Sequence, residues 1–398
     1  MVEGGRNNAG MPTITHPAYF LSHLAPGSTT NLFHKTNKSA AVGSRKLTLP
    51  AGGVLGGGSS TNFLMYSRAQ KSDLDAWGVP GWSSAEMLPY LKKLESYHGK
   101  DEKGVHGRDG PIHVSRGPFA SRRLEDQFTA AAAKVGWPEV EDVQDMETVN
   151  AVGRAYRYSQ ITRILFDDGK AVGVEFRPNP IFGGDASAVR SVKGRKLVIA
   201  ACGACGTPAL LERSGVCDPR ILPAAGVPVV APVPGVGNGF QDHHLLVYPY
   251  LNSLDDSGTI DALAHGRMGT PEELIKQNHP MLGWNAQDVQ AVLVSLDAPL
   301  PADVPDIEYA REDDAVLEKW LRENVNTTWH SLGTCKMAPR EQNGVVDANL
   351  GVYGLKNLKV ADLSVVPHNV AANTNSVALA VGEKAADIFI AEIGQGLN

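Results

Sequence analysis

The chain has 398 residues, a length that predicts two domains or one large intertwined unit with a sizeable core. With 42% apolar residues, 20% charged residues and 42 glycines, the composition excludes a disordered or fibrous chain. A formal net charge of −6, without long basic runs, excludes nucleic acid and anionic membrane surfaces as expected partners.

No stretch is apolar over enough residues to cross a membrane, and the start MVEGGRNNAG lacks the basic and apolar regions of a secretory signal. The last residues, GQGLN, do not match a peroxisomal tripeptide. Four cysteines are too few for a disulfide scaffold. We therefore expect an intracellular protein, in the cytoplasm or the peroxisome.

Residues 51–66, AGGVLGGGSSTNFLMY, predict a loop that closes on a rigid polar ligand. Glycines let the backbone approach such a ligand without a Cβ, and the hydroxyl and amide groups that follow supply hydrogen-bond donors. A helix is expected to start near Ser59 and to offer its N-terminus to negative charge. A dinucleotide is the obvious ligand, yet neither G-x-G-x-x-G nor G-x-x-x-x-G-K-[ST] occurs in the chain.

Two amphipathic helices and a hairpin are expected next. In residues 82–97, Ser83 and Glu86 form a capping box. The apolar face of this helix consists of Met87, Leu91 and Leu94. A second helix in residues 121–137 is expected to bury Leu124, Phe128 and Val135. Asp168-Gly169 joins two apolar runs and predicts a hairpin turn.

Residues 196–215, KLVIAACGACGTPALLERSG, predict a buried strand, a glycine turn and a helix, with Thr207 as N-cap and Pro208 at the first helical position. This is an α/β unit, in which ligands bind at the carboxyl ends of strands. Cys202 and Cys205 have the spacing of a redox dithiol or half a metal site. No second C-x-x-C supports that alternative, so we interpret them as compact apolar residues.

The last third of the chain predicts a strand, a loop and a helix. The strand ends at Asp362, and Thr374 stands among the residues that cap the helix. The helix face is expected to contain Val377, Val381, Ala385 and Ile388. His243 and His244 are neighbours in an extended stretch, so we expect one buried and one exposed ring rather than a metal pair.

Four of these segments resemble one family. AGGVLGGGSSTNFLMYSRAQKSDLDAW looks like the first signature of the glucose-methanol-choline (GMC) oxidoreductases, which depend on FAD. GACGTPALLERSGV resembles their second signature, PGVGNGFQDHH the segment after it, and WHSLGTCKM to NTNSVALAVGEKAADI the C-terminal block. NTTWHSLGTCKMAPRE and NVAANTNSVAL look most like the fungal alcohol (methanol) oxidases within the family.

The resemblance implies an α/β fold, with a FAD/NAD(P)-binding Rossmann-like domain and a reduced α+β substrate domain. Residues 1–244 would be the FAD-binding region, 245–315 the shortened substrate-domain region, and 316–394 the C-terminal region that returns to the FAD domain. VEGG matches the end of the family's second strand, so the first βα unit, which carries the dinucleotide glycines, is missing. We interpret the chain as N-terminally and internally truncated.

The resemblance also implies the site residues. His330 and Asn373 would be catalytic, and no metal is implied. The residues implied to bind FAD are Glu3, Gly56, Gly57, Ser59, Ser60, Asn62, Ile161, Trp329, Asp362 and Thr374. Among them, Glu3 would bind the ribose hydroxyls and Ile161 the adenine end.

The implied reaction oxidises a small alcohol to an aldehyde. His330, with an ordinary pKa near 6.5, would take the hydroxyl proton while the alcohol carbon gives hydride to flavin N5. Asn373 would orient the substrate oxygen, and the helix after it would stabilise negative charge on the flavin. Oxygen would reoxidise the flavin and yield hydrogen peroxide. The sequence leaves open whether the protein forms a homo-oligomer.

Two alternatives stay open at this point. One is another GMC activity, on aryl alcohols, choline or sugars, and a substrate panel separates it from the first. The other is a non-catalytic remnant unable to hold FAD, because G-x-G-x-x-G is absent. A yellow purified protein supports an enzyme, and a colourless one supports the remnant.

Overall fold

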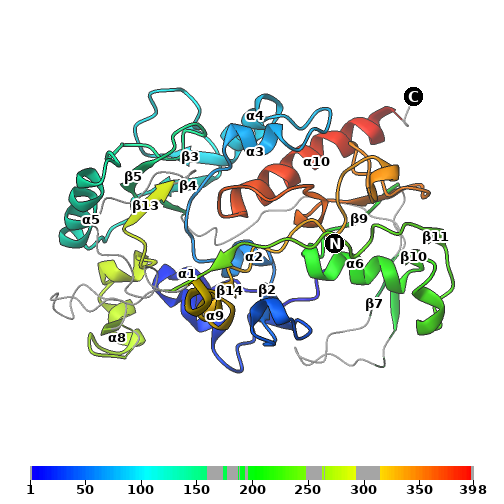
Figure 1. The fold of residues 1–398 in the computed structure, drawn as a ribbon, viewed down its shortest axis with the longest axis horizontal. Helices are drawn as coiled ribbons and strands as arrows, with labels where there is room; N and C mark the ends of the chain where they lie inside the picture. Colours follow the sequence, from blue (N-terminus) through cyan, green and yellow to red (C-terminus); the bar gives the residue numbers. More distant parts are fainter. Residues whose placement is uncertain are drawn as a thin grey trace.

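The computed structural model describes residues 2–158, 174–176, 187, 189–192, 196–247, 262–263, 265–292 and 314–395. The long C-terminal helix α10 (Asn375–Gln395) runs obliquely across the upper half of Figure 1, and the N-terminus lies beside α6 (Gly203–Arg213). The N-terminus therefore lies near a helix from the middle of the sequence.

The other helical segments are short. They are α1 (Pro12–Thr15), η1 (Pro17–Leu24), η2 (Ala40–Val42), α2 (Gly58–Thr61), α3 (Lys71–Asp75), α4 (Ser84–Leu94), α5 (Arg122–Lys134), η4 (Leu222–Ala225), α8 (Pro271–Lys276), η6 (Pro280–Gly283), α9 (Asp314–Asn324), η7 (Arg340–Gln342) and η8 (Leu363–Val365). The strands are β1 (Asn31–Lys35), β2 (Thr48–Gly52), β3 (Glu95–Tyr97), β4 (Ile112–Ser115), β5 (Ala151–Arg154), β6 (Arg157–Tyr158), β7 (Val174–Phe176), β8 (Arg190–Val192), β9 (Val198–Ala200), β10 (Val216–Cys217), β11 (Ala231–Pro232), β12 (His244–Leu245), β13 (Val289–Val292), β14 (Asn326–Thr327) and β15 (Leu358–Val360).

Small sheets of both strand directions connect these helices. β9 pairs in parallel with β15, and β10 pairs in parallel with β11. Antiparallel pairs join β1 to β2, β13 to β5, β12 to β14 and β7 to β8, while β4 lies between β3 and β6. Parallel strands need crossover connections, which helices usually supply, so this mixture agrees with the predicted α/β class.

Strand β9 was expected to be buried, and this expectation is wrong for its middle residue. Ile199 exposes 44% of its surface, and Cys202, just beyond the strand, is exposed as well. Within the described residues, β9 has a partner strand only on the β15 side. Successive side chains of a strand point to opposite faces, so Ile199 lies on the other face of β9 from the buried Ala200.

The main core includes buried side chains of α4 and α10 and extends to residues 197–236 and 332–370. The predicted capping box is present, because the Ser83 side chain accepts from the Glu86 backbone and the Glu86 carboxylate accepts the Ser83 N–H at 3.0 Å. The predicted apolar faces are also confirmed. On α4 they bury Met87, Leu91 and Leu94. On α10 they bury Val377, Val381 and Ala385, while Ile388 is partly buried against the same core.

Helix α6 begins earlier than predicted. Cys202 is its N-cap residue, while Thr207 and Pro208 lie inside the helix. A proline in a helix leaves the carbonyl four residues earlier without its usual partner. Here the Thr334 hydroxyl donates to that carbonyl, on Ala204, at 2.7 Å. A contact from a distant segment thus stabilises a helix start that local signals do not predict.

Helix α5 turns the opposite face inward from the one predicted. Leu124 and Phe128 are exposed, whereas Glu125, Thr129 and Ala132 are buried. Glu125 pairs with Arg154 of β5 at 2.8 Å. This ion pair fixes the rotation of the helix, and periodicity alone does not reveal it.

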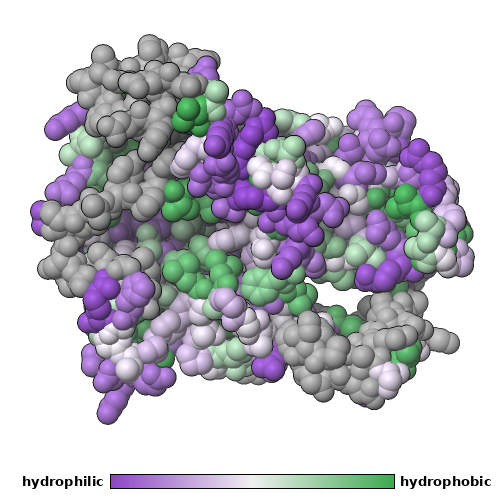
Figure 2. Space-filling model, turned by 60° about the horizontal axis from the view of Figure 1, so that its bottom comes forward, coloured by the Kyte–Doolittle hydropathy of each residue, from purple (hydrophilic) through white to green (hydrophobic). Residues whose placement is uncertain are grey.

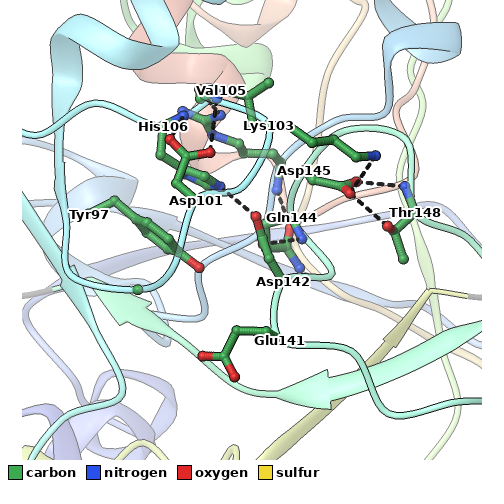
Figure 3. Close-up of polar contacts among 12 residues, drawn as sticks. Tyr97, Asp101, Lys103, Val105, His106, Glu141, Asp142, Gln144, Asp145 and Thr148 are labelled. Atoms are coloured by element: carbon green, nitrogen blue, oxygen red, sulfur yellow. Dashed lines mark hydrogen bonds and ion pairs between the residues drawn. The ribbon is translucent and has the colours of Figure 1, made fainter.

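A buried ionic network holds the loop that follows β3. Glu95 accepts from the Arg68 guanidinium at 2.6 Å and from the Tyr66 hydroxyl at 2.6 Å. The His106 ring joins Glu95 through Nδ1 at 2.8 Å and Asp142 through Nε2 at 3.0 Å. Figure 3 shows the neighbouring part of this network, in which the His106 ring and the loop around Asp142 approach each other.

The face of the molecule shown in Figure 2 carries apolar patches near its middle, with polar side chains around them. Exposed apolar side chains include Leu21 of η1, Phe33 of β1 and Val316 of α9. Among the described residues, no helix is both long and apolar enough to cross a membrane. The predicted hairpin at Asp168-Gly169 falls outside the described residues.

Candidate active site

The glycine loop packs tightly against the chain on one side and faces open space on the other. A Cβ on Gly5 would lie 2.5 Å from the Gly53 carbonyl oxygen, and one on Gly52 would lie 2.1 Å from the Gly57 carbonyl carbon. By contrast, Cβ atoms on Gly57 and Gly58 would meet no atom within 4 Å. These last two glycines leave the backbone accessible to a ligand.

The polar residues after the glycines mainly stabilise the loop itself. The Ser60 hydroxyl donates to the Leu55 carbonyl at 2.8 Å and accepts from the Asn8 amide at 3.0 Å. Asn62 Oδ1 accepts the Leu64 N–H at 2.9 Å. Helix α2 has only four residues, so the expected N-terminal anion site after the loop is not present.

Ser59 has a different partner. Its hydroxyl donates to Asn375 Oδ1 at 3.0 Å, at the first residue of α10. The glycine loop and the start of α10 are therefore neighbours, although 316 positions separate the two residues. Figure 1 shows α2 below the N-terminal half of α10.

Asp362 follows β15 and holds the start of α6. Its Oδ2 accepts the Gly203 N–H at 3.0 Å and the Thr207 hydroxyl at 2.5 Å, while Oδ1 accepts the Ser364 N–H at 2.8 Å. Both oxygens thus have partners within the chain. Gly203 itself has a φ of +76°, and a Cβ there would meet nothing within 4 Å.

His330 is positioned by an antiparallel alignment of two distant segments. Gln241 and Leu332 exchange backbone hydrogen bonds of 3.1 Å, and His244 of β12 pairs with Thr327 of β14. Between these pairs, Asp242 Oδ1 accepts the backbone N–H of His330 at 2.9 Å. Asp242 Oδ2 accepts the Thr327 hydroxyl.

The His330 ring is neutral at pH 7. Burial, and then the neighbouring His243, lower the pKa of His330 to about 4. The Nδ1 atoms of the two rings lie 2.9 Å apart. Of the His243-His244 pair, which was expected to have one buried and one exposed ring, His244 is exposed and His243 is partly buried.

Trp329 precedes His330 in an uncommon backbone conformation, with a φ of +65°. The backbone N–H of Trp329 donates to the Thr327 hydroxyl oxygen at 2.7 Å. The indole meets the Phe63 ring edge-on at 5.1 Å, and Phe63 contacts Phe20 in turn at 4.4 Å. Because Phe63 follows the glycine loop, these rings bring the loop and the His330 segment together.

Asn373 and Thr374 lie at the start of α10. The Asn373 N–H donates to the Ser67 hydroxyl at 2.8 Å, and the Ser376 hydroxyl donates to the Ser67 carbonyl at 2.7 Å. Thr374 is buried, and its carbonyl accepts the first helical hydrogen bond, from Ala378. Ser67 therefore sets the position of this helix start.

Residues 241–243 also hold the segment before Asn373. Asn369 donates from its backbone to Gln241 Oε1 at 2.9 Å and from its amide to the Asp242 carbonyl at 3.3 Å. The Val370 carbonyl accepts from His243 Nε2 at 2.7 Å. The segments carrying the two predicted catalytic residues thus meet on the same three residues.

The remaining predicted cofactor-binding residues are Glu3, Gly56 and Ile161. Glu3 is exposed, and its carboxylate accepts the Gly5 N–H at 2.7 Å. Gly56 has a φ of +89°, which supports the turn of the loop. Ile161 is outside the described residues.

Sequence reasoning missed three residues that organise this region, namely Ser67, Asp242 and His243. The Asp-His dipeptide in PGVGNGFQDHH was the available signal. Its partners His330 and Val370 are 87 and 127 positions away, so the contacts follow only from the fold.

The residues present fit the flavin end of FAD. Gly57, Gly58 and Gly203 leave open the positions that Cβ atoms would fill. The N-terminus of the 21-residue α10 lies beside this loop and favours negative charge. The neutral imidazole of His330 and the carboxamide of Asn373 belong to the two segments that meet on residues 241–243.

Family models identify the chain. The N-terminal model of the GMC oxidoreductases matches residues 29–156 and 146–245, and the C-terminal model of the same family matches residues 250–382. Together they cover most of the chain, including the glycine loop, the 241–243 segment, His330 and Asn373.

Two curated relatives align over nearly the whole chain. The chain is 27% identical to the alcohol oxidase of Pichia angusta over 603 positions, which cover 99% of this chain and 91% of that protein. Since this chain has 398 residues, about one third of those positions have no counterpart here. It is 26% identical to an oxygen-dependent choline dehydrogenase of Rhizobium johnstonii, covering 97% of this chain and 90% of that protein.

Solved structures share the fold. A FAD-dependent oxidoreductase from Chaetomium thermophilum superposes with a TM-score of 0.76 at 20% identity, covering 98% of this chain and 94% of that one. A fungal aryl-alcohol oxidase gives a TM-score of 0.70 at 19% identity, with 98% and 94% covered. The predicted α/β fold class is confirmed, and FAD is the cofactor that the family implies. The chain belongs to the GMC oxidoreductase family.

Proposed function

We propose that this chain binds FAD and oxidises a small alcohol, with His330 as the base and Asn373 as the residue that orients the substrate oxygen. One observation carries the proposal. Residues 241–243 are hydrogen-bonded both to the His330 segment and to residues 369–370, just before Asn373. The segments that carry His330 and Asn373 are thereby both held against residues 241–243.

The cofactor would lie against the open side of the glycine loop. Gly57 and Gly58 would let it approach the backbone, and the N-terminus of α10 would face its electron-rich edge. Ser59 and Thr374 lie at this junction, whereas Ser60, Asn62 and Asp362 support it by fixing the loop and α6. When bound, FAD supplies the two-electron acceptor for the alcohol, and oxygen is the proposed final acceptor that yields hydrogen peroxide.

His330 would act on the hydroxyl of the substrate. Its pKa of about 4 keeps the ring neutral at pH 7, so a ring nitrogen has a free lone pair that accepts the hydroxyl proton. The Asn373 carboxamide both donates and accepts hydrogen bonds, and it would hold the same oxygen. Trp329 and Phe63 would exclude water from one side of the site.

An alcohol is the substrate class that the names of the relatives support. The names of the alcohol oxidase of Pichia angusta and of the fungal aryl-alcohol oxidase both give an alcohol as the substrate. Choline, named for the Rhizobium johnstonii relative, is also an alcohol. The common chemistry is oxidation at a carbon that bears a hydroxyl group.

A second candidate is a chain that folds without FAD. It is favoured by Ser60, Asn62 and Asp362, whose side-chain oxygen atoms have partners inside the protein. Such a protein would need no cofactor to satisfy these groups. It would bind neither flavin nor alcohol.

Absorbance of the purified chain separates the two candidates. The protein is incubated with FAD, passed over a desalting column, and examined for bound flavin. An anaerobic panel of methanol, ethanol, benzyl alcohol and choline follows. The proposal expects retained yellow colour that at least one alcohol bleaches. Loss of all flavin on the column supports the second candidate, and retained flavin that no alcohol bleaches contradicts the proposed activity.

A further inference from the structure

The rings of His243 and His330 form a hydrogen-bonded chain that ends on a backbone carbonyl. Nε2 of His243 lies 2.7 Å from the Val370 carbonyl oxygen, and Nδ1 of His243 lies 2.9 Å from Nδ1 of His330. The rings meet edge-on, with centroids 5.0 Å apart and an interplanar angle of 88°. Each atom's bonding capacity then determines where the hydrogens lie.

A carbonyl oxygen only accepts hydrogen bonds, so Nε2 of His243 carries a hydrogen. When His243 is neutral, its Nδ1 has no hydrogen, so the Nδ1–Nδ1 contact requires His330 to be the donor. His330 therefore carries its hydrogen on Nδ1 and leaves Nε2 bare. A bare nitrogen is the form of imidazole that accepts a proton.

The backbone around the two rings is fixed by one carboxylate. Asp242 Oδ1 accepts the N–H of His243 at 2.8 Å and the N–H of His330 at 2.9 Å. The Asn369 amide binds the Asp242 carbonyl, which holds the Val370 carbonyl in reach of His243. Asp242 therefore holds all three groups of the hydrogen-bonded chain, namely His330, His243 and the Val370 carbonyl.

We propose that His243 is a positioning residue that fixes the tautomer of His330, so that the bare Nε2 atom is presented as the proton acceptor. In serine proteases a carboxylate holds the catalytic imidazole in its tautomer in the same way. Here a second imidazole, itself oriented by a backbone carbonyl, has that role. The catalytic consequence rests on the proposed function, whereas the tautomer does not.

Nitrogen NMR of the full chain tests the tautomer without any activity. The ring nitrogens of isotopically labelled histidine are assigned with the His330→Ala and His243→Asn variants. The expected spectrum places the hydrogen of His330 on Nδ1 and that of His243 on Nε2. A hydrogen on Nε2 of His330 would overturn the inference, whatever the enzyme does.

Two substitutions test the consequence for catalysis. His243→Asn places a carboxamide near the former Nδ1 and can still accept from His330, whereas His243→Leu cannot. We expect His243→Leu to lower the limiting rate of anaerobic flavin reduction by about 100-fold, which is typical of losing a general base. The alcohol concentration that gives half of the limiting rate should change little. His243→Asn should keep most of the rate.

His244→Leu is the matched control, because its exposed ring adjoins His243 in the chain. It should reduce flavin at the wild-type rate. Equal losses in His243→Asn and His243→Leu, or no loss in His243→Leu, would contradict a tautomer-fixing role. If alcohols fail to reduce the wild-type flavin, the proposed function fails, and the NMR result alone decides this inference.

Discussion

The Asp362 carboxylate binds the Thr207 hydroxyl at 2.5 Å, across 155 positions of the chain. The same oxygen accepts the Gly203 N–H, and the other oxygen accepts the Ser364 N–H. One side chain therefore caps η8 and attaches the start of α6 to the end of β15. Both helix starts border the proposed flavin site.

Replacing Asp362 should destabilise the fold. Asp362→Asn keeps the shape but removes the charge and one acceptor oxygen, so we expect a loss of about 1–2 kcal/mol in the free energy of unfolding. Urea unfolding measures this change. Asp109→Asn, at an exposed carboxylate, is the control and should leave the midpoint unchanged. Equal midpoints for both variants would refute the role of Asp362.

The α6 start shows why sequence patterns predict some elements better than others. The capping box of α4 is local, since Ser83 and Glu86 bond to each other, and the sequence predicts it correctly. Thr207 and Pro208 also look like a helix start. Yet the Thr207 hydroxyl accepts from the Cys202 N–H and binds Asp362, and this tertiary contact is invisible to a local pattern.

The buried Arg68–Glu95 pair should be costly to break from one side only. Both side chains are almost fully buried, with a nitrogen-to-oxygen distance of 2.6 Å. Arg68→Met leaves the Glu95 charge without its main partner, and we expect a loss of about 3–5 kcal/mol in unfolding free energy. Adding Glu95→Gln should recover part of this loss. Strictly additive losses in the double variant would contradict the coupling.

His106 should make stability depend on pH. Burial disfavours the charged ring, but hydrogen bonds with Asp142 and Glu95 outweigh this effect and raise the pKa of His106 above 6.5. A raised pKa adds stability that is fully present below the unfolded value and is lost as pH rises through the folded value. We expect urea midpoints to fall as pH rises above neutrality.

The matched variant for this test is His106→Gln, which can still donate a hydrogen bond but does not titrate. Its urea midpoint should vary less with pH than that of the wild type over the same range. A wild-type profile no steeper than that of the variant would show that His106 is not the titrating group.

Lys384 of α10 should stabilise the packing against α4 through aromatic rings. Its Nζ lies 4.9 Å from the Tyr90 ring centroid and 5.2 Å from that of Trp82. Lys384→Ala removes both the cation and the packed stem, and we expect a loss of about 1–2 kcal/mol. Lys384→Arg should retain most of the stability in thermal unfolding. A stable Lys384→Ala variant would contradict this assignment.

The site was less predictable than the elements that carry it. His330 and Asn373 follow from resemblance, because single residues of these types have no distinctive local pattern. What holds their segments is Asp242 and Ser67, through bonds to residues 88 and 306 positions away. Only the folded chain brings these partners together. The rotation of α5 has the same explanation, since the Glu125–Arg154 pair overrides its apolar stripe.

The most direct test of the proposed function is the rate at which an alcohol bleaches FAD-loaded protein under anaerobic conditions, compared between the wild type and His330→Ala. Removing a general base lowers such a rate by about 100-fold or more. His34→Ala, at an exposed histidine of β1, is the control and should match the wild type. We expect His330→Ala to keep its flavin and to be reduced at least about 100-fold more slowly. Equal reduction rates in His330→Ala and the wild type would contradict the assignment of His330 as the base.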